Sequence, residues 1–243
     1  MQVRVLPFGI LKESLGSDPF ALELPGGATV ADLVARLGVQ APTVESLGIA
    51  VSVNAEYADR SQVLSENDEV GLLPPVSGGH DPGSRLQREK EPTARLTREP
   101  IAADALVSAA KQGEDGAVVV FDGIVRNNSR GRQTLYLDYE SYEEMATKQM
   151  NELAREAVTR FGVRHVAIVH RLGRLHVGET SVLIIVASAH RAPAYEASRW
   201  LIDTLKKTVP IWKKETFVDG AVWADGEPFP PGYVVEAADG PSS

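Results

Sequence analysis

Residues 190–215 read HRAPAYEASRWLIDTLKKTVPIWKKE and contain a candidate helix, a candidate strand and a concentration of basic side chains. The pattern predicts a helix over 192–207 that ends before Pro210, because proline cannot continue a helix, and an extended segment over 211–218. Six cationic or potentially cationic side chains flank this helix: His190, Arg191, Lys206, Lys207, Lys213 and Lys214. The whole chain carries a net charge of −8, so this local basicity indicates a site for a small anion.

Composition excludes several classes of protein. The 243 residues allow one large domain or two small ones. The absence of cysteine excludes disulfides, thiolate metal sites and cysteine nucleophiles. A pI near 5.2 argues against nucleic-acid binding, which needs a basic face. The sequence has no apolar run of about 18 residues and no signal-peptide pattern at its start, so we expect no membrane association and a cytoplasmic protein.

Charge and composition divide the chain into two modules. Residues 1–79 hold four basic and ten acidic residues, and the remainder is nearly balanced. Between the two modules, residues 80–93 have the Pro, Gly, Ser and charged composition of a linker. We therefore predict a first domain over 1–79, a linker over 80–93, a second domain over 94–228 and a flexible tail over 229–243. The alternative is a long surface loop within one domain, although such loops are uncommon.

The predicted elements indicate an α+β protein. In the first module we predict strands over 1–7, 20–24, 49–54 and 69–74, and a helix over 31–37 that Thr29 caps. Two strands, a helix and further strands are the order of a β-grasp, or ubiquitin-like, fold. In the second module helices and strands are mixed. The predicted helices span 101–111, 142–161 and 192–207, and the predicted strands span 116–125, 135–140, 165–170, 181–189 and 211–218.

Gly78 and Gly79 close the first module. Two glycines form a thin tail without side chains, which can enter a narrow tunnel and present its last carbonyl to chemistry. The alternative is the plain start of a linker.

Together these motifs resemble molybdopterin synthase. The first module resembles its small subunit, a ubiquitin-like sulfur carrier, and the second resembles its large catalytic subunit, so the chain looks like a fusion of the two. The resemblance covers roughly residues 1–79 and 93–223. It rests on Glu69, Val70, 74–79 (PPVSGG), 121–126 (FDGIVR), 170–173 (HRLG), 188–191 (SAHR) and 205–215 (LKKTVPIWKKE).

The resemblance implies a reaction and its partners. The large subunit converts cyclic pyranopterin monophosphate to molybdopterin, and each dithiolene sulfur arrives as a thiocarboxylate on the terminal glycine of the small module. No permanently bound cofactor and no metal are implied. The implied partners are the pterin substrate, an enzyme that adenylates and sulfurates the small module, and a second copy of the chain in a homodimer through the large-subunit domain.

The resemblance also assigns roles to residues. Lys206 and Lys213 match catalytic lysines, with Lys206 acting at the glycyl carbonyl and Lys213 as its electrostatic and acid–base partner. Arg126, His190 and Arg191 match substrate-binding positions, and Phe121 matches a pocket-lining position. We expect all of them to line one cation-rich cavity. The alternatives are dipole compensation by Lys206 at a helix end, a solvated charge run at Lys213, a mobile basic loop at Arg126, and structural roles for His170, His176 and His190.

The sequence departs from the family in two ways. Gly79 is followed by His80 and has no free carboxylate, so we expect activity to require cleavage after Gly79; otherwise the fusion is an inactive precursor or a non-catalytic carrier and pterin-binding protein. Residues 215–243 contain no Lys or Arg, whereas the family usually adds a basic residue from its tail. A phosphate-ester hydrolase is a further alternative, but the sequence has no metal-ligand spacing that supports one.

Overall fold

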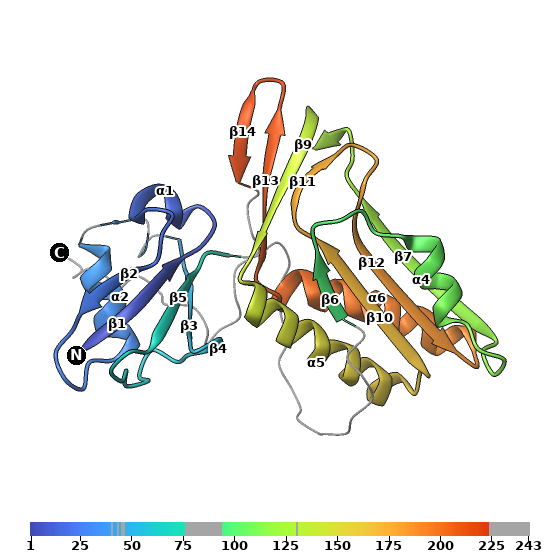
Figure 1. The fold of residues 1–243 in the computed structure, drawn as a ribbon, viewed down its shortest axis with the longest axis horizontal. Coiled ribbons are helices and arrows are strands. Elements are labelled where there is room, and N and C mark those ends of the chain that lie inside the picture. Colours follow the sequence, from blue (N-terminus) through green and yellow to red (C-terminus); the bar gives the residue numbers. More distant parts are fainter. Residues whose placement is uncertain (40, 43, 45–46, 76–93, 130, 224–243) are drawn as a thin grey trace, which may run out of the picture. The chain divides into compact units, whose positions relative to one another are not determined.

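The computed structural model describes residues 1–39, 41–42, 44, 47–75, 94–129 and 131–223. The chain divides into two compact units, one formed by the first module and one by the second (Figure 1). Gly78 and Gly79, the predicted linker over 80–93 and the predicted tail over 229–243 lie outside the described residues. In the described part of the chain, no helix is long and apolar enough to cross a membrane.

The first unit is a β-grasp, which confirms the predicted fold class. Its five-stranded sheet has the order β2-β1-β5-β3-β4, with β1 parallel to β5 and the other pairs antiparallel. The elements are β1 (Gln2–Pro7), α1 (Leu11–Leu15), β2 (Phe20–Glu23), α2 (Val30–Gly38), β3 (Ala50–Val53), β4 (Glu56–Tyr57) and β5 (Glu69–Leu73).

Helix α2 begins where the sequence predicts a cap. The Thr29 hydroxyl accepts the Asp32 N–H at 3.3 Å, and the Asp32 carboxylate accepts the Thr29 N–H at 2.8 Å. This capping box satisfies two backbone donors that the helix leaves without partners. The apolar face of α2, which includes Leu33 and Leu37, packs in one core with the sheet residues Val5 and Leu72.

The second unit contains two sheets, in which most strand pairs are antiparallel, and three helices among the residues that the structure describes. One sheet has the order β6-β10-β12-β7, and the other has the order β11-β9-β13-β14, with β8 paired to β9. The elements are β6 (Ala94–Thr97), α4 (Ala103–Ala110), β7 (Ala117–Ile124), β8 (Asn128–Ser129), β9 (Arg132–Ser141), α5 (Glu143–Phe161), β10 (His165–Arg171), β11 (Gly173–His176), β12 (Thr180–Ser188), α6 (Arg191–Thr208), β13 (Ile211–Phe217) and β14 (Gly220–Trp223).

The predicted helices and strands of this unit are present, with ends that differ by at most three residues. Four strands were not predicted: β6, β8, β11 and β14. Each has two to four residues. Segments this short carry little periodicity, and they become strands because a longer neighbour pairs with them, as β10 does with β6.

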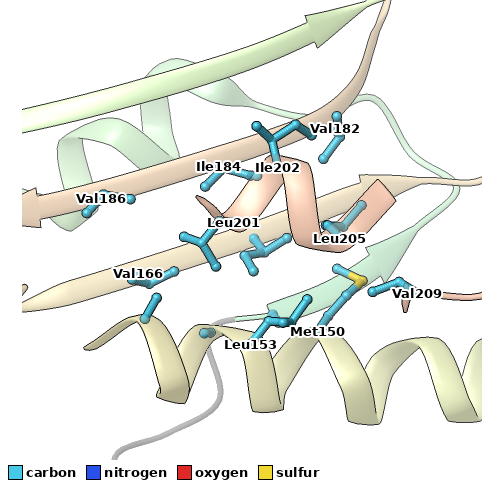
Figure 2. Packing of buried hydrophobic residues seen from close by; sticks show 14 of the residues in the cluster. Met150, Leu153, Val166, Val182, Ile184, Val186, Leu201, Ile202, Leu205 and Val209 are labelled. Atoms are coloured by element: carbon cyan, nitrogen blue, oxygen red, sulfur yellow. The ribbon is translucent and has the colours of Figure 1, made fainter. Parts of the chain in front are cut away.

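Strand β12 is covered on both faces. Ile184 and Val186 face the core that α5 and α6 form, while Leu183 and Ile185 face the cluster around α4. Figure 2 shows α6 laid along β12, with Leu201 and Leu205 directed between β12 and α5. Burial on both faces explains why β12 reads as a continuous apolar run rather than an alternating one. On α5, Met145, Met150, Leu153 and Ala157 are buried, and Phe161 is partly exposed with its ring beside that of Trp200.

Candidate functional site

Three charged side chains meet beside the end of β7. Lys213 Nζ lies 2.9 Å from the Glu215 carboxylate, whose side chain is only 9% exposed. Burial acts to raise the pKa of Glu215, but hydrogen bonds from Lys213 and Ser129 and the charges of Lys213 and Arg126 outweigh it, so the pKa lies below its usual value. Glu215 is therefore an anion surrounded by two cations, and this place keeps a net positive charge that suits an anionic ligand.

Glu215 is a site residue to which the sequence analysis gave no role. It belongs to the quoted stretch 205–215, but only as the end of a charge run. A signal was available: residues 213 and 215 of one strand project to the same face, because side chains alternate along a strand. The alternative of a solvated charge run at Lys213 does not fit the burial of its partner carboxylate.

Lys206 lies in the last turn of α6 and is exposed. The chain passes from this turn to Lys213 in β13 through Val209 and Pro210, both buried. The Val209 N–H donates to the Leu205 carbonyl at 3.1 Å, which closes the helix, and β13 then begins at Ile211. Lys206 and Lys213 thus flank one short connection. The last helical turn is also where a lysine compensates the helix dipole.

His190 and Arg191 lie at the opposite end of α6. His190 is the N-cap residue and Arg191 begins the helix. Fifteen helical steps separate Arg191 from Lys206, which corresponds to about 22 Å along the axis. The register agrees: Ser188 pairs with Ala117 at the start of β7, whereas Arg126 follows the end of that strand. The predicted single cavity is therefore wrong for one copy of the chain, because a rigid helix and a strand hold the two groups of cations apart.

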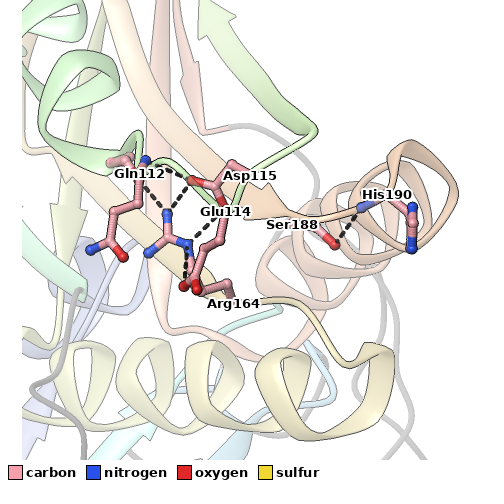
Figure 3. A network of polar contacts seen from close by, with 7 residues as sticks. Gln112, Glu114, Asp115, Arg164, Ser188 and His190 are labelled. Atoms are coloured by element: carbon pink, nitrogen blue, oxygen red, sulfur yellow. Dashed lines mark hydrogen bonds and ion pairs between the residues drawn. The ribbon is translucent and has the colours of Figure 1, made fainter.

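The turn that carries His190 is braced by a polar network (Figure 3). The Arg164 guanidinium binds both oxygens of the Asp115 carboxylate, lowering the pKa of Asp115, and the Arg164 N–H donates to the Ala187 carbonyl at 3.0 Å. The Gly116 N–H donates to the Ser188 carbonyl at 3.1 Å. A Cβ atom on Gly116 would lie 2.2 Å from the Ala189 carbonyl oxygen. This close backbone approach requires glycine.

Phe121 is half-buried and packs against the core that α5 and α6 form. It pairs with Ile184 in the middle of the β7–β12 ladder. The structure therefore does not bring Phe121 into the group formed by Arg126, Lys213 and Glu215, since the four residues 122–125, three of them in β7, separate it from Arg126.

His170 of β10 is buried and does not add a cation to the site. Its ring packs edge-on against Tyr139 with centroids 5.2 Å apart, and Nδ1 lies 3.0 Å from the Arg171 carbonyl oxygen. Burial lowers the pKa of His170 to about 4, so its imidazole is neutral at pH 7. This confirms the structural role that the sequence analysis held open for His170. His176 is exposed, and its ring contacts Tyr136.

Among the described residues, no group of three or more His, Asp or Glu side chains is placed to hold a metal ion.

Replacing His170 with Gln should flatten the pH dependence of stability. The unfolded state takes up a proton on this histidine near pH 6.5 and the folded state only near pH 4, so acidification between these values favours unfolding by up to about 3 kcal/mol. Urea unfolding followed by tryptophan fluorescence measures this, because Trp200, Trp212 and Trp223 all lie in the second unit. Equal pH dependence of the two proteins would contradict the neutral, buried state of His170.

Replacing Gly116 with Ala should destabilise the second unit by about 1–3 kcal/mol, because the added methyl meets the Ala189 backbone. Gly113→Ala is the matched control: it changes the same loop, and an added Cβ there has no atom within 4 Å. The same fluorescence-monitored urea unfolding compares the two. If both variants unfold at the same urea concentration, the stability of the second unit does not depend on the close approach of Gly116 to the Ala189 backbone.

Comparisons with known proteins identify the two units. Residues 5–79 match the ThiS family model, and residues 96–208 match the MoaE protein model. The molybdopterin synthase catalytic subunit of Pyrococcus abyssi is 42% identical over 144 residues, covering 59% of this chain and 93% of that protein. The catalytic subunit of Homo sapiens is 34% identical over 169 residues, covering 67% and 90%.

A solved structure agrees with these matches. The crystal structure of molybdopterin synthase from Staphylococcus aureus superimposes with a TM-score of 0.51 at 39% identity, covering 54% of this chain and 95% of that chain. The chain therefore belongs to the molybdopterin synthase family and joins a ThiS-family unit and a MoaE catalytic unit in one polypeptide.

Proposed function

We propose that this chain is a molybdopterin synthase that transfers sulfur from a glycine thiocarboxylate to cyclic pyranopterin monophosphate and so forms the dithiolene of molybdopterin. Its role in molybdopterin biosynthesis follows from its catalytic-subunit relatives. The observation that carries the finer proposal is the presence of both family matches, over 5–79 and 96–208, in one chain. A sulfur carrier and a catalytic unit for the same product then come from one gene product.

The group around Glu215 supplies the chemistry that this reaction needs. Arg126 binds the phosphate of the substrate, since a guanidinium donates paired hydrogen bonds to phosphate oxygens. The Glu215 carboxylate binds Lys213 Nζ at 2.9 Å and lies near Arg126. It therefore orients the Lys213 ammonium before substrate arrives. Lys206, on the helical side of the same connection, moves protons or attacks at the glycyl carbonyl. No permanently bound cofactor takes part, because the sulfur arrives on the carrier.

We propose a homodimer through the second unit, because one copy cannot bring all the predicted ligands to one substrate. About 22 Å of helix separates Arg191 from Lys206. A second copy that presents the start of its α6 to Arg126 and Lys213 of the first would complete the site with His190 and Arg191. This arrangement supplies further positive charge without a basic residue in 215–243.

Mixed dimers test this arrangement. Arg191→Ala and Lys206→Ala should each abolish most dithiolene formation when alone. Coexpressed in equal amounts, they should restore about one quarter of wild-type activity, because half of the dimers are mixed and each mixed dimer has one intact site. Molybdopterin is measured as its fluorescent oxidation product. A single-copy site would give no restoration. Full activity of Lys206→Ala alone would remove Lys206 from the mechanism.

Cleavage after Gly79 is the second requirement of the proposed function, because an internal peptide carbonyl cannot carry a thiocarboxylate. Protein cut after Gly79 should form molybdopterin when supplied with substrate, a sulfide source and the adenylating enzyme, and uncut protein should not. Gly79→Pro, which no longer offers the cleavage sequence, should accumulate as the full-length species and remain inactive.

Mass spectrometry of the chain from its native host provides the deciding measurement. A lone full-length species in cells that make molybdopterin would contradict cleavage, and would favour the alternative that this fusion is a precursor or a non-catalytic carrier and pterin-binding protein.

A further inference from the structure

We propose that Arg171 is a positioning residue for Arg126 and acts through the carboxylate of Glu179. Arg171 belongs to the stretch 170–173 (HRLG), in which His170 has a structural role but Arg171 has so far been given none. The inference rests on the proposed function, in which Arg126 binds the phosphate of the substrate.

Arg171 and Glu179 form an ion pair beneath the β11–β12 turn. Arg171 Nη1 lies 3.0 Å from Glu179 Oε1, and the Arg171 side chain is only 12% exposed. Arg171 Nε also donates to the Arg98 carbonyl at 3.4 Å. The guanidinium is thus engaged by protein oxygens and largely removed from solvent, so it is suited to hold a neighbouring segment rather than to bind substrate itself.

The Glu179 carboxylate ties both ends of the turn together. Its second oxygen accepts the His176 N–H at 2.6 Å, while the Glu179 N–H donates to the His176 carbonyl at 3.0 Å. The hydrogen bonds from His176 and Arg171 hold the pKa of Glu179 below its usual value. The carboxylate therefore remains charged near neutral pH and keeps Arg171, the end of β11 and the start of β12 in one arrangement.

This turn is bonded directly to the residue before Arg126. The Val125 N–H donates to the Glu179 carbonyl at 3.0 Å, and the Gly178 N–H donates to the Val125 carbonyl at 2.9 Å. Val125 is 2% exposed and packs with Leu137 and Leu175. Arg126 follows Val125 in the chain, so the position of the Arg126 Cα atom depends on the turn that Glu179 and Arg171 hold.

The far side of Arg126 is tied to a different sheet. The Asn127 carbonyl accepts the Thr134 N–H of β9 at 3.0 Å. Arg126 therefore lies between two backbone anchors, of which one leads to β9 and the other leads through Val125 and Glu179 to Arg171. Loss of the second anchor should displace the guanidinium from the phosphate without removing any group that contacts substrate.

The test is a double-mutant cycle between Arg171→Met and Arg126→Ala in protein cut after Gly79. Arg171→Met keeps most of the length of the stem and removes the charge. We expect it to raise the KM for cyclic pyranopterin monophosphate about tenfold, with a smaller change in kcat, and to have no further effect when Arg126 is already Ala. Arg171→Lys, which keeps the charge, should recover part of the loss.

Arg174→Met is the matched control. Arg174 lies three residues further along the chain and has its own carboxylate partner, Asp138, at 3.0 Å, but that pair joins β11 to β9 and does not include the residues bonded to Val125. Its KM should equal that of the wild type. If Arg171→Met does not fold, Glu179→Gln breaks the same ion pair from the other side and should give the same non-additivity with Arg126→Ala.

The outcomes separate this inference from the proposed function. If Arg126→Ala leaves the KM unchanged, the role of Arg126 in the proposed function fails. If Arg126→Ala raises the KM but Arg171→Met does not, or if Arg171→Met has the same effect in both backgrounds, the positioning role of Arg171 is overturned and Arg126 keeps its role.

Discussion

The packing of α6 along β12 determines where the cations of the second unit can lie. The helix follows the strand through a short turn and runs back over it, with Leu201, Ile202 and Leu205 in the core that β12 shares with α5. A helix of this length that packs one face on a sheet does not bend to bring its ends together. The basic residues at its start and at its end therefore lie at two separate places on the unit, although both groups belong to the one sequence stretch 190–215.

Beyond the C-terminal end of α6, the buried carboxylate of Glu215 holds the charged side chains in place. A carboxylate as buried as that of Glu215 is unfavourable unless cations and hydrogen-bond donors compensate it, and Lys213, Ser129 and Arg126 do so from three different segments. The carboxylate thus orders side chains that would otherwise repel one another. Because two cations surround one anion, the group remains attractive to a phosphate, and the cost of assembling it is met before a ligand arrives.

The same arrangement occurs around two of the candidate substrate-binding residues, Arg126 and His190. Arg126 follows a strand end that the Arg171–Glu179 pair holds, and His190 follows a strand end that Arg164, Asp115 and Gly116 hold. In both cases an arginine–carboxylate pair lies one layer away from the residue that would touch substrate. Positioning by such pairs suits a site built on loops between strands, since loop backbones have few ladder hydrogen bonds of their own.

The sequence by itself determined the longer elements and the family. Apolar periodicity, the Thr29 cap and Pro210 located the long helices and strands, since these signals are local and act over a few residues. The motifs indicated molybdopterin synthase, and the family matches over 5–79 and 96–208 agree. Only the tertiary structure decided which of the motif residues meet. Glu215 lies near Arg126, and His170 is buried, because strands distant in the chain pair with one another. Arg191 is separated from Lys206 because a long packed helix lies between them. Local residue spacing predicts neither the strand pairing nor the packing of the helix.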